Sequence, residues 1–537
     1  MRQASYVGVP QGVRLAELVA ALSLGIDLGF GQPMEHVLRQ CLIATRLAEQ
    51  HGLDEDQRGC VYWTALLVGV GCHTDAHEQA KWFGDDLELK RDKYDYDMHS
   101  LRGAVAGIRR IGAGHPPLHR FRIGLEFAVS GYRDVDDMIA QHAAMARRLA
   151  EQLGLPDDVL EGIGASYEQW DGKGWPGALR GEAVPVAARI ASLAEYVEVA
   201  YRTGGSASVQ ELAKARRGKQ FDPTLSDLVQ SGIDGLISGL EQVQTWDEVV
   251  GAQPALAHVL GERELDAALT AIADFIDLKS PYTLGHARAV ADLVVEAAAV
   301  LGLPNATGRQ LRLAAFISSF GRLGVSNAIW DKPGPLGGGE RERVRLHPYL
   351  SERMVQQSPS LLPLGSLAVQ VRERLDGSGY PRGLTGAALS APSRLLAVAD
   401  AYQSMTEPRP YRAALGADEA ARLLRAEVDA GRLDAAAVDA VLTATGHRVP
   451  RRREGPAGLT AREIEVLQLL ARGRSNKEIA RQLVIAHKTA GNHVEHIYAK
   501  IGAVNRAGAS LFAVQHGLLP EEPPWGEHPM DDLAAPS

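Results

Sequence analysis

The chain is 537 residues long, which is enough for three or four domains that each bury a core of their own. Its composition, 45% hydrophobic and 23% charged, is that of an ordinary globular protein and argues against wholesale disorder. The three cysteines are too few for a disulfide framework, which fits a reducing cytoplasm. The net charge of −9 taken alone argues against a nucleic-acid binder, but its distribution along the chain reverses that argument.

No signal peptide or membrane helix is predicted at the beginning of the chain. The most apolar stretch, residues 15–30, is interrupted by Glu17 and Asp27 and is too short to span a bilayer. It also lacks a cleavage site of small residues. We therefore expect a cytoplasmic protein that has no membrane partner.

The first 450 residues contain one unit repeated twice. Matching residues are 250 positions apart in the first part of the unit and 205 apart in the rest, so the first copy carries an insertion of about 45 residues between Cys72 and His142. Such constant offsets indicate a duplication. The matched pairs include His36 with His286, His142 with His347, Glu195 with Asp400, and EQWDGKGWP from Glu168 with ERLDGSGYP from Glu373.

Both copies have the pattern of helical proteins. Long segments rich in Ala, Leu and Val, such as residues 269–277, 287–301 and 343–356, predict helices, and no segment shows sustained period-two alternation. Gly and Pro cluster in the DGSGYP stretch, which we expect to be a turn between helices. The predicted fold class is therefore all-α.

Five motifs of the second copy carry a resemblance to a known family. They are SPYTLGHARAVADL, AAFISSFGRLGVSNAIWDKPGPL, ERVRLHPYLSERM, ERLDGSGYPRGL and RLLAVADAYQSMTEPRPYR. Together they resemble the HD-GYP branch of the HD metal-dependent phosphohydrolases. The resemblance implies helical domains that bind two or three metal ions and that, in active members of the family, hydrolyse cyclic di-GMP.

The residues that would hold those metals are largely missing from the second copy. The family's His-Asp pair falls at Ser318 and Ser319, and its pair of histidines falls at Val371 and Arg372. A hydroxyl is a poor ligand for hard divalent ions, and Arg372 brings a permanent positive charge into a site built for cations. The resemblance is therefore strong for the fold and poor for the chemistry.

The first copy has lost the same parts, at Val68, Gly69, Ser166 and Tyr167. Two histidines and one carboxylate remain in each copy, a set that could in principle hold one divalent ion. The alternative, which we favour, is that they are buried polar residues that form hydrogen bonds in a helical core, so that no metal is expected. The remnant positions are His36, His142 and Glu195 in the first copy and His286, His347 and Asp400 in the second.

Two further groups of residues are candidate binding sites. Arginines around the DGSGYP loop could attract a small anionic effector, and the predicted cleft consists of Arg322, Arg372, Asp376, Tyr380 and Arg382. Cys72, His73, Asp75 and His77 cluster in the first copy, and the two histidines are four residues apart, a spacing usable for zinc on a helix. A solvated helix start after Gly71 is the simpler account of this second group, and we favour it.

Residues 459–519 form a basic module on an acidic chain. Between residues 451 and 519 there are eleven Lys and Arg against five Asp and Glu, and residues 520–537 carry five acids and no Lys or Arg. Two capping boxes, Thr460 with Glu463 and Ser475 with Glu478, mark where two helices begin. One basic module on an acidic body is the pattern expected if only that module contacts phosphates.

A third predicted helix in this module is amphipathic. Its apolar residues, Val494, Ile497, Tyr498 and Ile501, repeat at i, i+3, i+4 and i+7. We expect the opposite face to be polar and basic and to carry no acid. A short helix, a tight turn and a helix with such a face place a recognition helix in the major groove of DNA. That face carries Thr489, Asn492, His496 and Lys500.

The motifs SNKEIA, KT, NHVEHIYAKIG and RA resemble the LuxR-type helix-turn-helix module of bacterial transcription regulators. The resemblance implies a four-helix domain that binds double-stranded DNA; a helical bundle that contacts another protein is the alternative. Ala486 stands where the family usually has a capping Ser, and Gly491 lies within the recognition helix, at a cost of about 1 kcal/mol. The residues predicted to contact DNA are Ser475, Asn476, Lys477, Lys488, Thr489, Asn492, His493, His496, Lys500 and Arg506.

The expected domain order follows from these patterns. It is a degenerate HD domain at residues 1–240, a connector at 241–262, a degenerate HD-GYP-like domain at 263–450, a LuxR-type domain at 455–520 and a disordered acidic tail at 521–537.

Two main functions are consistent with this order. We favour a bacterial transcription regulator that binds DNA as a homodimer and is associated with the nucleoid when it is bound to DNA. Its HD-GYP-like domains would form a non-catalytic sensing and dimerising body that needs no cofactor. The alternative is a phosphohydrolase that acts on a cyclic dinucleotide or another phosphodiester with a single divalent metal ion in one or both HD-type domains. A protein-interaction scaffold is a third reading.

Overall fold

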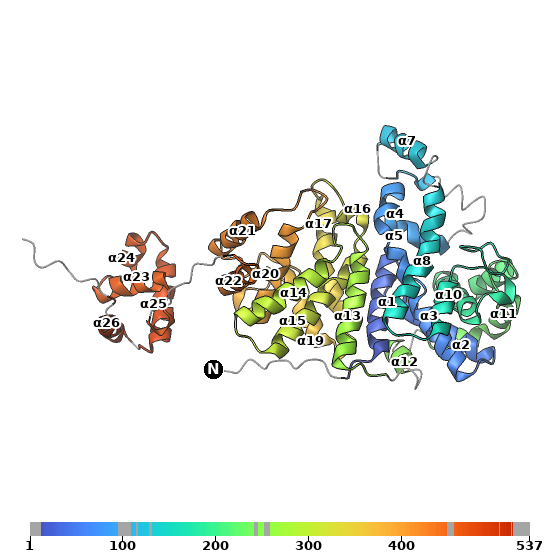
Figure 1. The fold of residues 1–537 in the computed structure, drawn as a ribbon, viewed down its shortest axis with the longest axis horizontal. Helices are drawn as coiled ribbons and strands as arrows, with labels where there is room; N and C mark the ends of the chain where they lie inside the picture. Colours follow the sequence, from blue (N-terminus) through green and yellow to red (C-terminus); the bar gives the residue numbers. More distant parts are fainter. Residues whose placement is uncertain are drawn as a thin grey trace, which may run out of the picture. The chain divides into compact units, whose positions relative to one another are not determined.

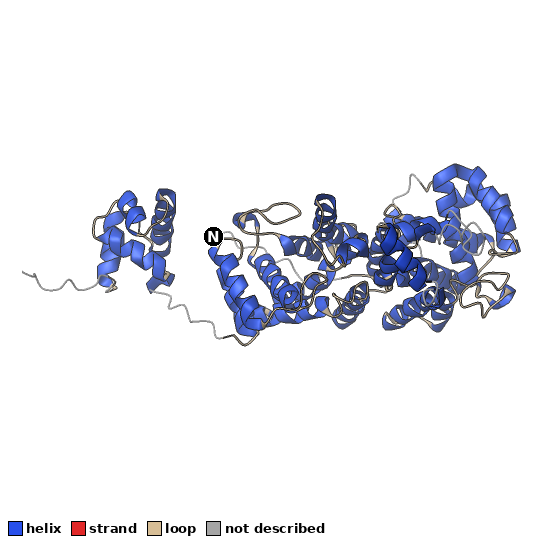
Figure 2. Ribbon diagram, turned by 90° about the horizontal axis from the view of Figure 1, so that it is seen from above, coloured by secondary structure: helices blue, strands red, loops and turns tan. Residues whose placement is uncertain are grey.

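The computed structural model describes residues 12–94, 109–113, 116–127, 132–240, 245–251, 258–447, 456–503, 505–516 and 518. The chain divides into two compact units, Met1–His447 and Arg448–Ser537. Over the described residues both units are built from helices and contain no β-strand, only four isolated bridges (Figure 2). The all-α prediction is confirmed, whereas most of the linker to the basic module and the predicted acidic tail lie outside the described residues.

The first copy of the repeat is built around α10, which packs against α2, α3 and α11. Its buried helices carry Leu, Ile, Val and Ala at helical spacing, which buries one face of each helix. In chain order the elements are α1 (Leu15–Gly29), α2 (His36–Gln50), α3 (Glu55–Leu67), η1 (Val70–His73), α4 (Ala76–Phe83), α5 (Asp86–Arg91), η2 (Asp92–Tyr94), α7 (Pro117–Glu126), α8 (Tyr132–Gln152), α9 (Asp157–Gly164), η4 (Gly181–Ala183), α10 (Val186–Arg216), α11 (Pro223–Ile237) and α12 (Thr245–Gly251).

The second copy is centred on α14, which packs against α15, α20 and α22 (Figure 1). The elements are α13 (Glu262–Asp277), α14 (His286–Val300), α15 (Asn305–Ser318), η6 (Phe320–Gly324), α16 (Asn327–Trp330), α17 (Gly338–Arg345), α18 (His347–Val355), α19 (Leu362–Ala368), η7 (Val369–Arg372), η8 (Gly386–Ala388), α20 (Ala391–Thr406), α21 (Ala417–Asp429) and α22 (Ala435–Ala444).

The two copies repeat each other in backbone detail. The Asp27 carboxylate accepts the Val37 N–H at 2.9 Å, and 250 residues later the Asp277 carboxylate accepts the Ala287 N–H at 2.8 Å. Gly71 lies against His142 in the first copy, and Gly321 lies against His347 in the second. A Cβ added to these glycines would lie 2.0 Å from the His142 carbonyl oxygen and 1.9 Å from the His347 carbonyl oxygen, respectively. The same contacts in both copies support the duplication inferred from the sequence.

Two predictions about individual segments need correction. The helix expected over residues 343–356 is two helices, α17 and α18, because Pro348 lacks an N–H and lies in the first turn of a new helix. The segment expected to be a connector forms α12, in which Trp246 and Val249 are buried. The Tyr62 hydroxyl donates a hydrogen bond to the Val249 carbonyl at 3.0 Å, so this segment completes the first copy's core.

The two copies pack against each other within the first unit. Helix α1 contacts η6 and α18 of the second copy, and at Gly25 the absence of a side chain makes room for Met354, since a Cβ there would lie 2.3 Å from the Met354 side chain. The buried carboxylate of Asp86 accepts hydrogen bonds from the Ser326 hydroxyl and the Asn327 N–H, both at 2.8 Å. The copies thus share one packed junction that contains satisfied polar groups.

The second unit is a small four-helix domain. After η9 (Pro456–Gly458) it contains α23 (Ala461–Ala471), α24 (Asn476–Gln482), α25 (His487–Ile501) and α26 (Arg506–Gln515). Both predicted capping boxes are present, at Thr460 with Glu463 and at Ser475 with Glu478. The domain has its own core, formed by residues that include Val466, Leu467, Leu470, Ile479, Ala490, Val494 and Ile497. Among the described helices of the whole chain, none is long and apolar enough to cross a membrane.

Candidate functional site

The outer face of α25 presents polar side chains to solvent. Lys488, Thr489, Asn492 and His496 are all exposed, whereas Val494 and Ile497 on the inner face are buried. Helix α25 packs against α24 and α23, so the small domain holds this face outward on a fixed support. The arrangement is that of a recognition helix whose inner face packs on supporting helices and whose outer face is free to contact DNA.

The predicted acid-free face of α25 needs one correction. Glu495 is exposed on this helix, one turn after Asn492, so the outer surface is less basic than the sequence pattern indicated. Of the remaining predicted contacts, Lys477 and Ser475 are exposed at the start of α24, whereas Asn476 and His493 are half-buried. The Ser475 hydroxyl is also a capping group for α24, so it has a structural role.

Two predicted DNA-contacting cations are engaged within the domain. The Lys500 ammonium donates to the Glu463 carboxylate at 2.7 Å and to the Gly458 carbonyl at 3.0 Å. Burial would raise the pKa of Glu463, but the hydrogen bonds from Lys500 and Thr460 outweigh it and lower that pKa. The Arg506 guanidinium donates to the Leu470 carbonyl at 3.1 Å, near the end of α23. Both side chains therefore tie helices of the domain together.

The turn into α25 carries the departures expected from the sequence and one that was missed. Ala486 is the N-cap and gives no side-chain hydrogen bond, and an added Cβ at Gly491 would meet only the Asn476 amide, at 3.9 Å. Val484 has a φ of 54° and its side chain is 90% exposed. A β-branched residue in the left-handed region is strained, so the backbone at Val484 lowers the stability of this turn.

In the second copy, the remnant residues are held by arginines. The Arg372 guanidinium lies 2.9 Å from the Asp400 carboxylate, and His286 Nε2 lies 3.3 Å from the same carboxylate. His286 Nδ1 is 2.7 Å from Glu407. Burial would raise the pKa of Asp400, but the charge of Arg372 and the hydrogen bond with His286 lower it strongly, so Asp400 is an anion paired with protein cations.

Arg322 occupies the neighbouring position. Its guanidinium donates to the Asp277 carboxylate at 3.0 Å, and the arginine is buried. His347 Nδ1 lies 2.7 Å from the Val344 carbonyl, and burial together with the nearby Arg372 lowers the pKa of His347 to about 3. His347 is therefore neutral at physiological pH.

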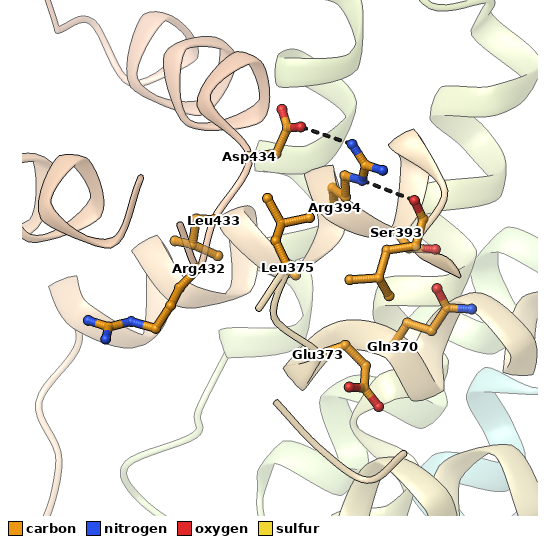
Figure 3. Close-up of a pocket in the computed structure, with 10 residues that line it drawn as sticks. Gln370, Glu373, Leu375, Ser393, Arg394, Arg432, Leu433 and Asp434 are labelled. Carbon is orange, nitrogen blue, oxygen red and sulfur yellow. Dashed lines mark hydrogen bonds and ion pairs between the residues drawn. The ribbon is translucent and has the colours of Figure 1, made fainter. Parts of the chain in front are cut away.

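The residues of the predicted effector cleft do not all face one another. The Tyr380 ring lies 5.2 Å from the Arg345 guanidinium, whereas Arg382 pairs with Glu352 and Asp376 accepts hydrogen bonds from Ser378 on the exposed loop. Behind the loop lies a cavity of about 10 Å³, room for roughly one water, which Arg394 crosses toward Asp434 (Figure 3). That cavity is a packing gap that is too small for an effector.

In the first copy, a lysine from the insertion occupies the remnant site. The Lys93 ammonium lies 2.5 Å from the Glu195 carboxylate, and the Tyr94 hydroxyl donates to the same oxygen at 2.7 Å. His36 Nδ1 lies 2.5 Å from the buried Glu198 carboxylate. Sequence reasoning missed Lys93 and Tyr94, because the insertion has no counterpart in the second copy to align with. It missed Glu198 because the matching position of the second copy, Gln403, is not a carboxylate.

The cluster of Cys72, His73, Asp75 and His77 is divided among separate contacts. His73 is buried and its Nε2 lies 2.8 Å from the Phe275 carbonyl of the second copy, and His77 Nδ1 lies 2.8 Å from Asp331. The two histidines therefore share no site, and the solvated helix start is also wrong for His73 because it lies in the junction between the copies. Cys72 and Asp75 instead contact His142.

These donor sets do not fit the metal centre that the family resemblance implies. Each remnant carboxylate is already neutralised by a protein cation, Lys93 or Arg372, at hydrogen-bonding distance. Within the described part of the chain, no three His, Cys, Asp or Glu side chains converge in a way that could hold a metal ion. No chemical step through a metal follows from these sites.

Comparisons with known proteins agree with this architecture. A family model for the HD domain matches residues 132–225 and 270–437, and a model for bacterial regulatory proteins of the luxR family matches residues 457–513. Over 87 residues, 16% of this chain, the protein is 40% identical to an uncharacterised transcriptional regulatory protein of Bacillus subtilis (strain 168), of which the match covers 41%.

A longer match covers the body of the chain. Over 415 residues the protein is 32% identical to the 3'3'-cGAMP-specific phosphodiesterase 3 of Vibrio cholerae serotype O1, a match that covers 76% of this chain and 90% of the relative. A crystal structure of a cyclic GMP-AMP-specific phosphodiesterase of V. cholerae superposes with a TM-score of 0.57 at 27% identity, over 81% of this chain and 98% of that one. The chain therefore belongs to the HD-domain proteins of the HD-GYP-like type and carries in addition a LuxR-type DNA-binding domain.

Proposed function

We propose that this protein is a transcriptional regulator whose tandem HD domains form a sensing and dimerising body without hydrolytic activity. The observation that carries the proposal is the exposed face of α25, on which Lys488, Thr489 and Asn492 project from a compact helical domain. Lysine is suited to phosphate contacts, and asparagine can form paired hydrogen bonds with an adenine edge. The regulatory output of the chain then lies in residues 456–518.

Protein cations in both remnant sites support a body that does not hydrolyse phosphodiesters. Hydrolysis with a metal ion needs ligands that leave the ion accessible to water and substrate. Lys93 and Arg372 would have to leave Glu195 and Asp400 before an ion could bind there, and each departure would leave a buried carboxylate without its partner.

The chemistry of the second copy's arginines suits an anionic ligand better than a metal ion. The Nε atoms of Arg322 and Arg372 have no hydrogen-bond partner among the described residues, and Arg345 lies over the Tyr380 ring nearby. Guanidinium groups and an aromatic ring are suited to a ligand that carries phosphate and a planar base. The V. cholerae relative is named for action on 3'3'-cGAMP, a ligand of that chemical class. We infer that a nucleotide of this kind is bound here as a signal.

Two copies of the chain would present two recognition helices. If the body dimerises, the DNA sites of the two modules should lie on one face of the duplex, about one helical turn apart. The effector would then act by favouring one arrangement of the two modules over another.

A genome-wide map of DNA bound by the full-length protein tests the proposal. We expect discrete sites that share a sequence with two half-sites, and an Asn492→Ala variant should lose or change that shared sequence. Uniform binding along the genome, or a map that Asn492→Ala leaves unchanged, would contradict sequence recognition by α25.

The alternative function is a metal-dependent phosphohydrolase, which the 90% coverage of the V. cholerae phosphodiesterase favours. It predicts bound divalent metal in the purified protein and turnover of a cyclic dinucleotide that stops on His347→Ala. Our proposal predicts neither a metal requirement nor turnover, while the effector still binds. Elemental analysis, a hydrolysis assay and calorimetric titration with 3'3'-cGAMP on one protein sample distinguish the two functions.

A further inference from the structure

One of the three cysteines has a different chemical environment from the other two. Cys72 Sγ lies 3.5 Å from His142 Nδ1 and 2.7 Å from the Tyr167 hydroxyl. On the other edge of the same imidazole, His142 Nε2 lies 2.7 Å from the Asp75 carboxylate. Cys72 lies on η1, Asp75 follows it and His142 lies on α8, which packs against η1 in the first copy, while Tyr167 follows α9.

The order of these contacts is that of an activated nucleophile. Because the sulfur and the carboxylate lie on opposite edges of the ring, they cannot both bind one metal ion. Instead, Asp75 accepts the Nε2–H and fixes the ring so that Nδ1 faces the thiol, from which it can take the proton. A thiolate beside an imidazolium results, stabilised by the carboxylate behind it.

The surrounding charges favour this ion pair. The titratable groups that face the sulfur are His142 on α8, Tyr167 after α9, and Lys93 on η2, with Glu195 of α10 and Asp75 beyond them. Burial would raise the pKa of Cys72, but the positive charge and hydrogen bond of His142, with a further contribution from Lys93, lower it. The negative sulfur and Asp75 raise the pKa of His142 to about 10 despite its burial.

The other two cysteines provide internal references. Cys41 is completely buried and its thiol donates a hydrogen bond to the Tyr62 carbonyl at 3.7 Å, and burial raises its pKa far above the ordinary value. Burial and the nearby Asp158 raise the pKa of Cys60 to about 11. Within the described part of the chain neither has a histidine at hydrogen-bonding distance, and their raised pKa values keep both as protonated thiols at neutral pH.

We propose that Cys72 is a modification site that reacts with hydroperoxides, activated by His142 and Asp75. The thiolate attacks one peroxide oxygen, the S–O bond forms as the O–O bond breaks, and the leaving hydroxide takes the proton of the His142 imidazolium to give water. The sulfur is oxidised to a sulfenic acid and the peroxide is reduced. Cys72 is a buried residue, 5% exposed, so the peroxide that reaches it must be small, and hydrogen peroxide is the smallest of the hydroperoxides.

The added oxygen has little space in the folded structure. The backbone of η1 is pressed against α8, since a Cβ on Gly71 would lie 2.0 Å from the His142 carbonyl. The oxygen must therefore displace the Tyr167 hydroxyl or the imidazole, which are the groups in contact with the sulfur. Oxidation would thus loosen the contact between η1 and α8 near Lys93.

The test is the rate at which each cysteine of the full-length protein is oxidised by hydrogen peroxide. The sulfenic acids are trapped with a dimedone-type reagent and located by peptide mass spectrometry. We expect Cys72 to be labelled more than about tenfold faster than Cys41 or Cys60, because one unit of thiol pKa changes the thiolate fraction about tenfold. In urea the three cysteines should react at similar rates, which controls for detection of each peptide.

Variants separate activation from simple access. His142→Gln should slow labelling of Cys72 about tenfold or more, and Asp75→Asn, a milder change, should slow it in the same direction. Cys60→Ser should leave the rate at Cys72 unchanged. Equal labelling of the three cysteines in the folded protein, or a rate at Cys72 that neither His142→Gln nor Asp75→Asn lowers in a protein with wild-type circular dichroism, would overturn the proposal.

Discussion

Two equivalent aspartates, one in each copy, differ in whether an arginine pairs with the carboxylate. Asp27 and Asp277 hold the same backbone position in the two copies. Asp277 pairs with Arg322, but position 72, where Arg322 would fall in the first copy, is a cysteine. Asp27 Oδ2 is accordingly buried without a hydrogen-bond partner among the residues that the structure describes, and burial raises the pKa of Asp27 to about 7, although His36 opposes the shift.

This raised pKa makes the stability of the first copy pH-dependent. Because the folded pKa exceeds the unfolded one, Asp27 favours folding below pH 4, and that contribution is lost as the pH rises toward 7. Asp27→Asn keeps the acceptor for Val37 and removes the buried charge. We expect it to raise the free energy of unfolding by roughly 2 to 4 kcal/mol at pH 8 and by much less at pH 4, measured by urea denaturation.

The matched control is Asp277→Asn. Burial raises the pKa of Asp277 as well, but here the charge of Arg322 opposes the shift. Asp277→Asn leaves the buried Arg322 without its carboxylate and should lower the free energy of unfolding by roughly 3 to 5 kcal/mol at pH 8. A loss of stability from Asp27→Asn at pH 8 would show that Asp27 is ionised and stabilising in the native protein.

At the scale of elements, α25 begins without a capping side chain. A serine at Ala486 could accept the N–H of a residue in the first turn, as Ser475 does for α24. Ala486→Ser should therefore stabilise the small domain by about 1 kcal/mol in thermal unfolding. Ala499→Ser, an exposed change inside the same helix, should be neutral or slightly destabilising. Equal effects of the two serines would indicate that the cap does not form.

Lys488, which is exposed on α25, and Lys500, which pairs with Glu463, should respond differently to mutation. Lys488→Ala is expected to weaken binding to all DNA sequences and to reduce the salt dependence by about one phosphate contact. Lys500→Ala removes the partner of Glu463 and should lower the melting temperature of the domain before it affects DNA. Fluorescence anisotropy at several salt concentrations, with a melting curve for each variant, separates these effects. If Lys500→Ala weakened DNA binding in a salt-dependent way and left the melting temperature unchanged, the Lys500 side chain would have to leave Glu463 and contact phosphate.

Sequence reasoning was most successful for local patterns. The capping boxes at Thr460 and Ser475 depend on residues three positions apart, and the repeat depends on matching letters, so both could be read directly from the chain. It failed where partners are distant: Lys93 meets Glu195 across 102 positions, and Lys500 meets Glu463 across 37. A lysine that is exposed to solvent and a lysine that pairs with a buried carboxylate look the same in the sequence, so only the fold distinguishes them.

At the scale of the whole molecule, the chain consists of two units with separate cores. A fragment of residues 1–447 should therefore fold alone and melt at the temperature of the corresponding transition in the full-length protein, and residues 456–518 should retain α-helical circular dichroism. Differential scanning calorimetry of the three proteins makes the comparison. A fragment of residues 1–447 that melts more than a few degrees lower would show that the DNA-binding domain contributes to the stability of the body.

The lysine at the centre of the first copy also changes how that site depends on its surroundings. A dissolved ion leaves when its concentration falls, whereas the Lys93 ammonium is tied to the same polypeptide and remains at a fixed local concentration beside Glu195. Chelators and metal starvation would therefore not change the charge balance at Glu195 in this copy. What can remove the charge is a change to the chain itself, by acetylation of Lys93 or by a cut in the insertion that carries it.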